Sequence, residues 1–155
     1  MPHQKYGAED HSYSKIIVLI FNKNKKLAIQ KIVIDADYLA EAVYQDCNNV
    51  RSYTTGKNKN IEAVDSDFGD LIVANLNFDG KEDLAIKRES GGAAGPFYKF
   101  YIQNEKNIFA KDIYLTEKMS SFPSDIDWKE KTLTTNIFAS YYSSHQTVLQ
   151  IQYRH

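Results

Sequence analysis

The apolar residues of this chain come in short runs that are rich in Ile, Val, Thr and aromatic residues. Side chains of these kinds favour β-strands, and 11 Tyr and 8 Phe accompany a single Trp. The longest run, Ile16–Phe21, is far shorter than the roughly 18 residues of a membrane helix. We therefore predict a strand-rich fold without a membrane span. The predicted strands are residues 15–21, 27–34, 70–74, 83–88, 97–103, 108–115, 132–139 and 147–153.

The order of these segments predicts an all-β, mostly antiparallel fold with one short helix. The polar stretch 22–26 suits a hairpin loop between the first two strands. A helix is predicted in 35–46, where Asp35 can cap and apolar residues recur at helical spacing. Residues 51–60 are predicted as a loop, because Thr, Gly, Lys and Asn dominate them. We expect about two packed sheets.

We predict one domain and no catalytic centre. A chain of 155 residues fits a single β domain over 14–155, preceded by a flexible N-terminal segment at 1–13. The 19 Lys and Arg balance 20 Asp and Glu, which argues against a nucleic-acid partner. The four His lack transition-metal spacing. Cys47 is interpreted as a small buried apolar residue. The acidic segment 65–70 is interpreted as turns and solvated faces, and its alternative is an outer calcium ligand or a second cation site.

The segment 75–83, Asn-Leu-Asn-Phe-Asp-Gly-Lys-Glu-Asp, has the spacing of a calcium-binding loop. An EF-hand would place a Glu where Ile86 stands and would be flanked by helices, so we predict a strand-loop-strand site. The same residue types also form capped turns without any metal, which is the alternative. With few carboxylates, the affinity should be weak, on the order of 10⁻⁴–10⁻³ M. The predicted Ca²⁺ ligands are Asn75, Asn77, Asp79 and Asp83 through side chains, and Lys81 through its carbonyl.

A second unusual segment, 89–98, contains Gly91, Gly92 and Gly95 and few bulky side chains. It lacks the Lys-Ser/Thr of a phosphate-binding loop, and no helix is predicted after it, so nucleotide binding is not expected. One interpretation is a flexible hairpin connection. The other is a slim loop that enters the cleft of another protein, because backbone without bulky side chains can approach closely.

Residues 75–86 and 90–102 together resemble the FG-GAP-like, calcium-binding envelope proteins of Gram-negative bacteria. That group includes immunity proteins against secreted lysozyme-like effectors and, more distantly, periplasmic inhibitors of invertebrate-type lysozyme. Shorter similarities lie at 29–32, 115–119, 122–123 and 131–135. The resemblance implies a propeller-like β unit, a structural calcium, a periplasmic or cell-envelope location, and inhibition by insertion of a loop into a lysozyme cleft.

We therefore expect a non-enzymatic inhibitor or immunity protein whose partner is a lysozyme-like peptidoglycan hydrolase. The partner-binding residues are predicted to be Ser90, Gly91, Gly92, Gly95 and Tyr98, with the two hydroxyl groups donating to the catalytic carboxylates. The alternative is a calcium-stabilised carbohydrate- or cell-surface-binding module. In that case Tyr98, Tyr101, Tyr141 and Tyr142 would stack on sugars. The first residues lack the apolar core of an export signal, which fits either a cytosolic protein or a mature form whose signal was removed, and the resemblance implies the periplasm or cell envelope.

Overall fold

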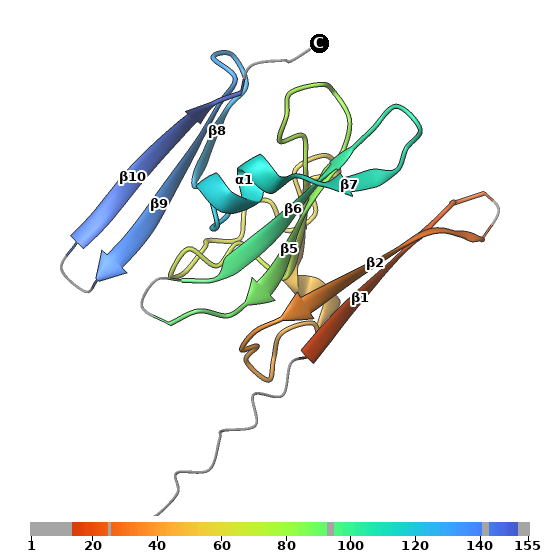
Figure 1. The fold of residues 1–155 in the computed structure, drawn as a ribbon, viewed down its shortest axis with the longest axis horizontal. Helices are drawn as coiled ribbons and strands as arrows, with labels where there is room; N and C mark the ends of the chain where they lie inside the picture. Colours follow the sequence, from red (N-terminus) through yellow and green to blue (C-terminus); the bar gives the residue numbers. More distant parts are fainter. Residues whose placement is uncertain (1–13, 25, 93–94, 141–142, 152–155) are drawn as a thin grey trace, which may run out of the picture.

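The computed structural model describes residues 14–24, 26–92, 95–140 and 143–151, and Figure 1 shows their arrangement. The predicted flexible segment 1–13 lies outside these residues. The strands are β1 (Ser14–Phe21), β2 (Ala28–Ala36), β3 (Val50–Ser52), β4 (Leu71–Ala74), β5 (Asp83–Glu89), β6 (Phe97–Gln103), β7 (Phe109–Lys111), β8 (Asp125–Asp127), β9 (Thr132–Ser140) and β10 (Ser143–Gln150). The helices are the 3-10 turn η1 (Cys47–Asn49) and α1 (Ile113–Lys118). Neither helix is long and apolar enough to cross a membrane.

The strands form three sheets within the described part of the chain. β1 and β2 pair antiparallel as the predicted hairpin, and β8, β9 and β10 form an antiparallel three-stranded sheet. The largest sheet has the order β3-β4-β5-β6-β7, in which β3 and β4 are parallel and the other neighbours antiparallel. The prediction of a mostly antiparallel, all-β fold with one short helix is therefore confirmed. There are three sheets instead of the expected two or so, because the hairpin packs on one face of the five-stranded sheet and does not join its edge as a further strand.

Both faces of the five-stranded sheet are covered. Successive side chains of a strand point to opposite faces, and on β5 Leu84 and Ile86 contribute to one core cluster while Ala85 contributes to another. The first cluster includes Ile34 of the β1–β2 hairpin, and the second includes Leu133 of β9 together with residues of α1. The molecule thus has three layers, with the five-stranded sheet in the middle (Figure 1).

The helix predicted at 35–46 is absent, and that prediction was wrong. The N–H group of Asp37 donates to the carbonyl of Arg88 at 3.0 Å, which holds the chain against the end of β5. Tyr44 has a φ of +62°, which no α-helix accommodates. Contacts with β5 therefore override the local helical pattern.

Cys47 lies at the start of η1 and is exposed, so its interpretation as a buried residue was also wrong.

The α-helix forms instead where the end of a strand was predicted. Residues 108–115 divide into β7 and α1, and Asp112 separates them. The Asp112 carboxylate accepts a hydrogen bond from the N–H of Leu115 at 2.7 Å, as an N-cap residue does. The strands β3 and β8 were missed because three residues carry too little periodicity to be recognised.

Candidate functional site

The predicted calcium ligands lie in the loop that joins β4 to β5. The Asp79 N–H is 3.1 Å from both the Asn75 Oδ1 and the Asn77 Oδ1 atoms. The Asp79 Oδ1 atom in turn accepts a hydrogen bond from the Lys81 N–H at 2.8 Å. These bonds are those of a self-capping turn, which was the alternative to a metal site. They also bring two amide oxygens toward one point, as a metal loop requires.

Asp83 closes this loop at the first position of β5 and is fully buried. Its Oδ2 atom accepts from the N–H groups of Leu76 and Asn77 at 2.7 and 3.3 Å, and its Oδ1 atom accepts from Gln103 N–H at 3.0 Å. Burial nevertheless raises the pKa of this carboxyl group to about 6, because desolvation of the charge outweighs the three backbone hydrogen bonds. The nearby Asp79 charge acts in the same direction as burial.

The loop contains two carboxylates, those of Asp79 and Asp83, together with amide and carbonyl oxygens. No group of three or more His, Cys, Asp or Glu side chains gathers among the described residues. A donor set made only of oxygens fits Ca²⁺, which prefers hard ligands. The observation that favours a cation is the buried Asp83 carboxylate, for which the structure gives no basic side chain as a partner within the described ranges.

The glycine-rich segment connects β5 to β6 and is anchored where it leaves β5. The Ser90 N–H donates to the Tyr38 carbonyl at 2.8 Å, and the Ser90 Oγ atom accepts from the Ala40 N–H at the same distance. At the other end of the segment, Gly95 packs against the turn at Asp65, whose carbonyl lies 3.0 Å from where a Gly95 Cβ would be. The connection is therefore tied at its base to two other parts of the chain.

Close backbone contact folds this connection back on itself. Gly91 has a φ of +65°, and a Cβ atom added to it would lie 1.8 Å from the Gly95 carbonyl oxygen. The Gly95 N–H also donates to the Gly92 carbonyl at 3.0 Å. Gly92 is exposed, and nothing lies within 4 Å of its Cβ position. Gly91 and Gly95 thus allow the chain to close, whereas Gly92 faces solvent.

Tyr98 does not belong to the exposed part of the connection. We predicted that it contacts a partner, but its side chain is fully buried in β6. Its hydroxyl donates to the Gly69 carbonyl at 2.8 Å, and burial raises the pKa of the phenol well above its ordinary value. The alternation of residues in 97–103 could not predict the burial of Tyr98, because apolar side chains occupy both faces of the strand.

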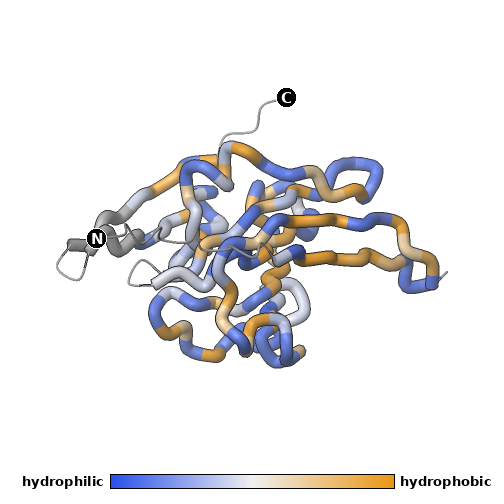
Figure 2. Tube along the Cα trace, turned by 60° about the horizontal axis from the view of Figure 1, so that its bottom comes forward, coloured by the Kyte–Doolittle hydropathy of each residue, from blue (hydrophilic) through white to orange (hydrophobic). Residues whose placement is uncertain are grey.

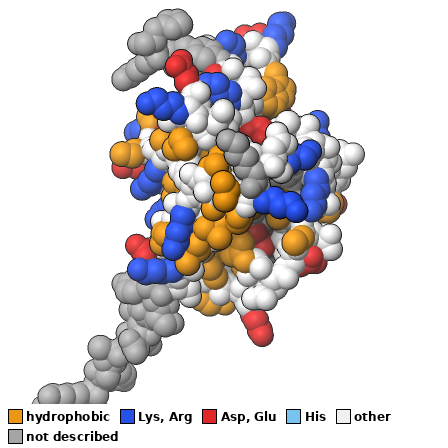
Figure 3. Space-filling model, turned by 90° about the vertical axis from the view of Figure 1, so that its right-hand side faces the viewer, with side chains coloured by type: hydrophobic (Ala, Val, Ile, Leu, Met, Phe, Trp, Pro, Cys, Tyr) orange, Lys and Arg blue, Asp and Glu red, His pale blue; other side chains and the backbone are white. Residues whose placement is uncertain are grey.

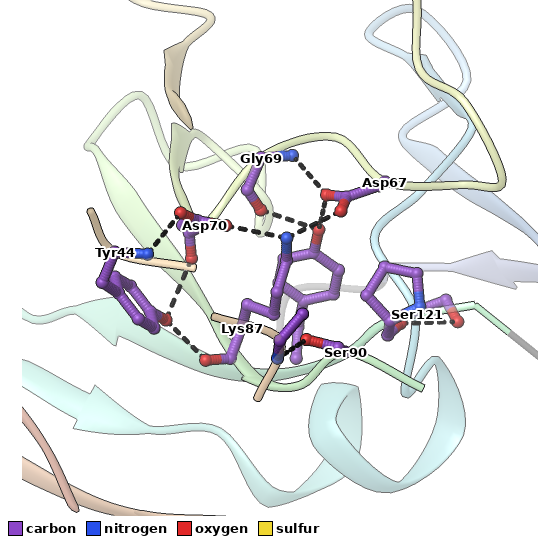
Figure 4. A network of polar contacts seen from close by, with 10 residues as sticks. Tyr44, Asp67, Gly69, Asp70, Lys87, Ser90 and Ser121 are labelled. Atoms are coloured by element: carbon purple, nitrogen blue, oxygen red, sulfur yellow. Dashed lines mark hydrogen bonds and ion pairs between the residues drawn. The ribbon is translucent and has the colours of Figure 1, made fainter. Parts of the chain in front are cut away.

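A largely buried polar cluster lies near Ser90, at the base of the connection (Figure 4). The Lys87 ammonium group is 2.8 Å from carboxylate oxygens of both Asp67 and Asp70. Asp70 also accepts a hydrogen bond from the Tyr44 N–H at 2.7 Å, and the Tyr44 hydroxyl donates to the Lys87 carbonyl. Burial, and then the Asp70 charge, raise the pKa of the Tyr44 phenol. We predicted that Asp70 lies on a solvated face, which is wrong because Lys87 allows its burial.

A cleft of about 550 Å³ lies between this cluster and the connection. Ser90, Gly92 and Gly95 line one side, and Asp65 and Asp67 belong to the acidic turn beside them. Three of the predicted partner-binding residues, Ser90, Gly92 and Gly95, thus share one surface with that turn, whereas Gly91 and Tyr98 do not line it. The calcium-type loop lies elsewhere, since none of its predicted ligands lines this cleft.

Sequence reasoning missed Lys87 and Tyr44 as parts of the site. Lys87 is in phase with Asp83 and Ala85 on β5, and all three side chains are buried. That phase was a usable signal, because a Lys on the inward face of a strand requires an acidic partner. Tyr44 gave no such signal, since its position follows from the absence of the predicted helix.

Comparison of the chain with protein-family models, with curated proteins and with solved structures gives no match. The connection and the calcium-type loop are therefore the features of this chain from which a function can be inferred. The resemblance of residues 75–86 and 90–102 to envelope proteins stays an expectation.

Proposed function

We propose that this chain is a non-enzymatic inhibitor, of the immunity-protein kind, of a lysozyme-like peptidoglycan hydrolase. In this proposal the accessible part of the connection, at Ser90, Gly91 and Gly92, enters the active-site cleft of the hydrolase, whereas Gly95 is buried against the rest of the chain and supports it. The sequence resemblance suggests the partner, and the shape of the connection supports the mode of contact. The protein would act in the periplasm or cell envelope, where peptidoglycan is found.

The observation that carries the proposal is the close backbone contact of Gly91 with Gly95 beside an exposed Gly92. A close approach that excludes a Cβ atom at Gly91 holds the segment in shape, and Gly92 is exposed. A thin segment can enter a groove where bulkier side chains would clash. Because its base is already held by hydrogen bonds, little conformational entropy is lost on binding.

Ser90 supplies the hydrogen-bond donor that the proposal needs. A hydroxyl group has one hydrogen to donate and two lone pairs. The Oγ atom of Ser90 uses a lone pair to accept from the Ala40 N–H, so its own hydrogen can be donated. Lysozyme-like hydrolases act through carboxylates, which accept such a bond. Ser90 therefore takes the role that we had also expected of Tyr98.

A bulky residue at Gly92 tests the proposal. Gly92→Trp places a large side chain at an exposed position with an open Cβ direction, so the fold should be kept and entry into a cleft blocked. We expect inhibition of the cognate hydrolase to weaken at least about 30-fold in a cell-wall turbidity assay, equivalent to about 2 kcal/mol. Lys129→Trp is the control, because the Lys129 side chain is 92% exposed and far along the chain from the connection.

Three results would contradict the proposal. One is a folded Gly92→Trp variant that inhibits as well as the wild type. A second is a wild-type protein that inhibits no hydrolase from any lysozyme class, including one encoded beside its gene. Lys129→Trp weakening inhibition as much as Gly92→Trp would also count against the connection as the contact.

The carbohydrate-binding alternative has less support. Tyr98 and Tyr101 are both buried, so neither ring presents a face on which a sugar could stack. Tyr141 and Tyr142, the other two aromatic residues in that hypothesis, lie outside the described residues. Binding to insoluble polysaccharide, measured alongside hydrolase inhibition, separates the two functions.

We also propose that Ca²⁺ stabilises the loop between β4 and β5. Asn75, Asn77, Asp79 and Asp83 would contribute side-chain oxygens and Lys81 its carbonyl. The cation would offset the cost of burying the Asp83 charge. A site with so few carboxylates would have weak affinity, which suits the millimolar calcium outside the cytosol.

Melting and fluorescence measurements test the calcium proposal without an activity assay. A ligand that binds only the folded protein raises the melting temperature, so millimolar Ca²⁺ should raise it relative to a chelator. The Phe78 ring in the loop lies 5.5 Å from the ring of the only Trp, Trp128, so binding should also change Trp fluorescence. Asp79→Ala should abolish both effects.

The control for this experiment is Asp46→Ala, which removes a carboxylate that caps a turn in another loop. It should lower the melting temperature slightly and keep the calcium-induced rise. Equal melting temperatures of the wild type with calcium and with chelator would contradict the proposal.

A further inference from the structure

The β1–β2 hairpin has large apolar side chains on both of its faces. Ile16, Ile32 and Ile34 point inward and are buried in the core that the hairpin shares with β5 and β6. The residues on the opposite side are 45–63% exposed, and we call them the outer hairpin face. They are Ile17, Leu19 and Phe21 of β1 and Ile29 and Val33 of β2, together with Leu27 immediately before β2.

This pattern differs from that of a strand with one face in solvent. Such strands alternate apolar and polar residues, whereas strands covered on both sides are apolar almost throughout. Ile16–Phe21 is the longest apolar run of the chain, and Figure 2 shows hydrophobic colour along much of the hairpin. Figure 3 shows hydrophobic side chains gathered on the side of the molecule toward which the hairpin extends. The sequence of β1 is therefore that of a strand with two apolar neighbours, and the described residues cover one side.

We propose that the outer hairpin face binds the same face of a second copy, giving a symmetric dimer. Two flat apolar sheets stack face to face with side chains interdigitating, at a separation of about 10 Å. When both partners use the same patch, a two-fold axis closes the assembly at two copies. The four strands then form a small sandwich between the two molecules.

The exposed apolar area is large enough for such a dimer. Half-exposed side chains of this size leave on the order of 100 Å² each outside the core, or about 600 Å² per copy for the six residues. Complete burial of both faces would remove about 1,200 Å² from solvent, which is the lower limit for specific interfaces and above most lattice contacts. The area is also at the upper end of the apolar patches that monomers leave exposed.

The charges on this face are compatible with a second copy. Lys15 lies directly opposite Asp35 in the register, so opposite charges are neighbours at one end of the hairpin. Lys31 lies opposite Leu19 and is the remaining charge of the face. A Lys at an apolar interface can cover it with its alkyl stem and extend its ammonium group to the rim. The face therefore does not repel its own copy strongly.

Sedimentation velocity over a range of concentrations tests the dimer. We expect the wild type to change from monomer to dimer between micromolar and submillimolar concentration. Leu19→Glu should raise the dimer dissociation constant at least about 100-fold, because it places a charge at the centre of the interface. The double variant Ile17→Thr/Leu19→Thr should do the same while keeping residues of high β-propensity.

The matched control is Val148→Glu, which changes an equally exposed apolar residue on β10 and should leave the dimer intact. Far-UV circular dichroism confirms that each variant is folded. A wild type that stays monomeric at all concentrations overturns the proposal, as do hairpin variants that dimerise like the wild type. Species that grow beyond two copies overturn it as well, because the proposed contact closes on itself.

Discussion

A single ammonium group holds together the polar cluster beneath the glycine-rich connection. The side chains of Lys87 and Asp70 are almost fully buried, whereas that of Asp67 is about half exposed. A buried ion pair gains little net stability over apolar residues of similar size, but removal of one partner leaves a charge without compensation. The cluster fixes the position of the turn at Asp67, which borders the cleft, and so contributes to the shape of the candidate site.

Replacement of Lys87 by Met should therefore be costly. Lys87→Met keeps most of the side-chain volume and leaves the Asp70 carboxylate with the Tyr44 N–H as a partner but no cation. We expect the free energy of unfolding in urea to fall by about 3–5 kcal/mol. Lys129→Met is the control, because Lys129 pairs with Glu130 on the surface at 3.9 Å, and it should change stability by less than about 0.5 kcal/mol. Similar effects of the two substitutions would show that the cluster is not stabilising as described.

The extent to which sequence predicts this molecule differs from element to element. The strand predicted at 97–103 is observed with the same bounds, because β-branched and aromatic residues fill it and turn residues border it. The conformation of segment 35–46 could not be predicted, because it depends on hydrogen bonds to residues far away in the sequence, such as the one from Asp37 to Arg88. Likewise the spacing of 75–83 identified a tight loop, but only the structure shows that Asp83 is buried and that Tyr98 faces the core.

The shape of the β5–β6 connection should depend on one glycine and not on its neighbour. Gly91→Ala adds a Cβ atom 1.8 Å from the Gly95 carbonyl oxygen at a positive φ, so the backbone must move. Gly92→Ala meets nothing within 4 Å. We expect Gly91→Ala to lower the free energy of unfolding by about 1–3 kcal/mol and to weaken hydrolase inhibition. Gly92→Ala should change stability by less than about 0.5 kcal/mol. If chemical denaturation shows that Gly92→Ala lowers the free energy of unfolding more than Gly91→Ala does, the close contact between Gly91 and Gly95 is contradicted.

The three layers of the molecule meet at the five-stranded sheet, which is therefore the structural centre of the fold. The β1–β2 hairpin covers one face of this sheet, while α1 and the β8–β10 sheet cover the other. Neither outer layer could bury its apolar side chains without the middle one. We accordingly expect the layers to unfold together, as the prediction of a single domain over 14–155 requires.

Adjacent residues of β2 allow this cooperativity to be tested. Ile34 is 1% exposed and packs in the core shared with β5, whereas Val33 points to the outer hairpin face and is 51% exposed. At concentrations low enough to keep the protein monomeric, Ile34→Ala should cost about 2–5 kcal/mol and Val33→Ala less than about 1 kcal/mol. Trp128 follows β8, in the layer on the other side of the sheet, and reports on that layer by fluorescence. For a single cooperative unit, Ile34→Ala must shift the Trp128 transition and the far-UV circular dichroism transition by the same amount. If the Trp128 transition stays at its wild-type midpoint, the hairpin unfolds separately, because the loss of core packing at Ile34 would then leave the stability of the opposite layer unchanged.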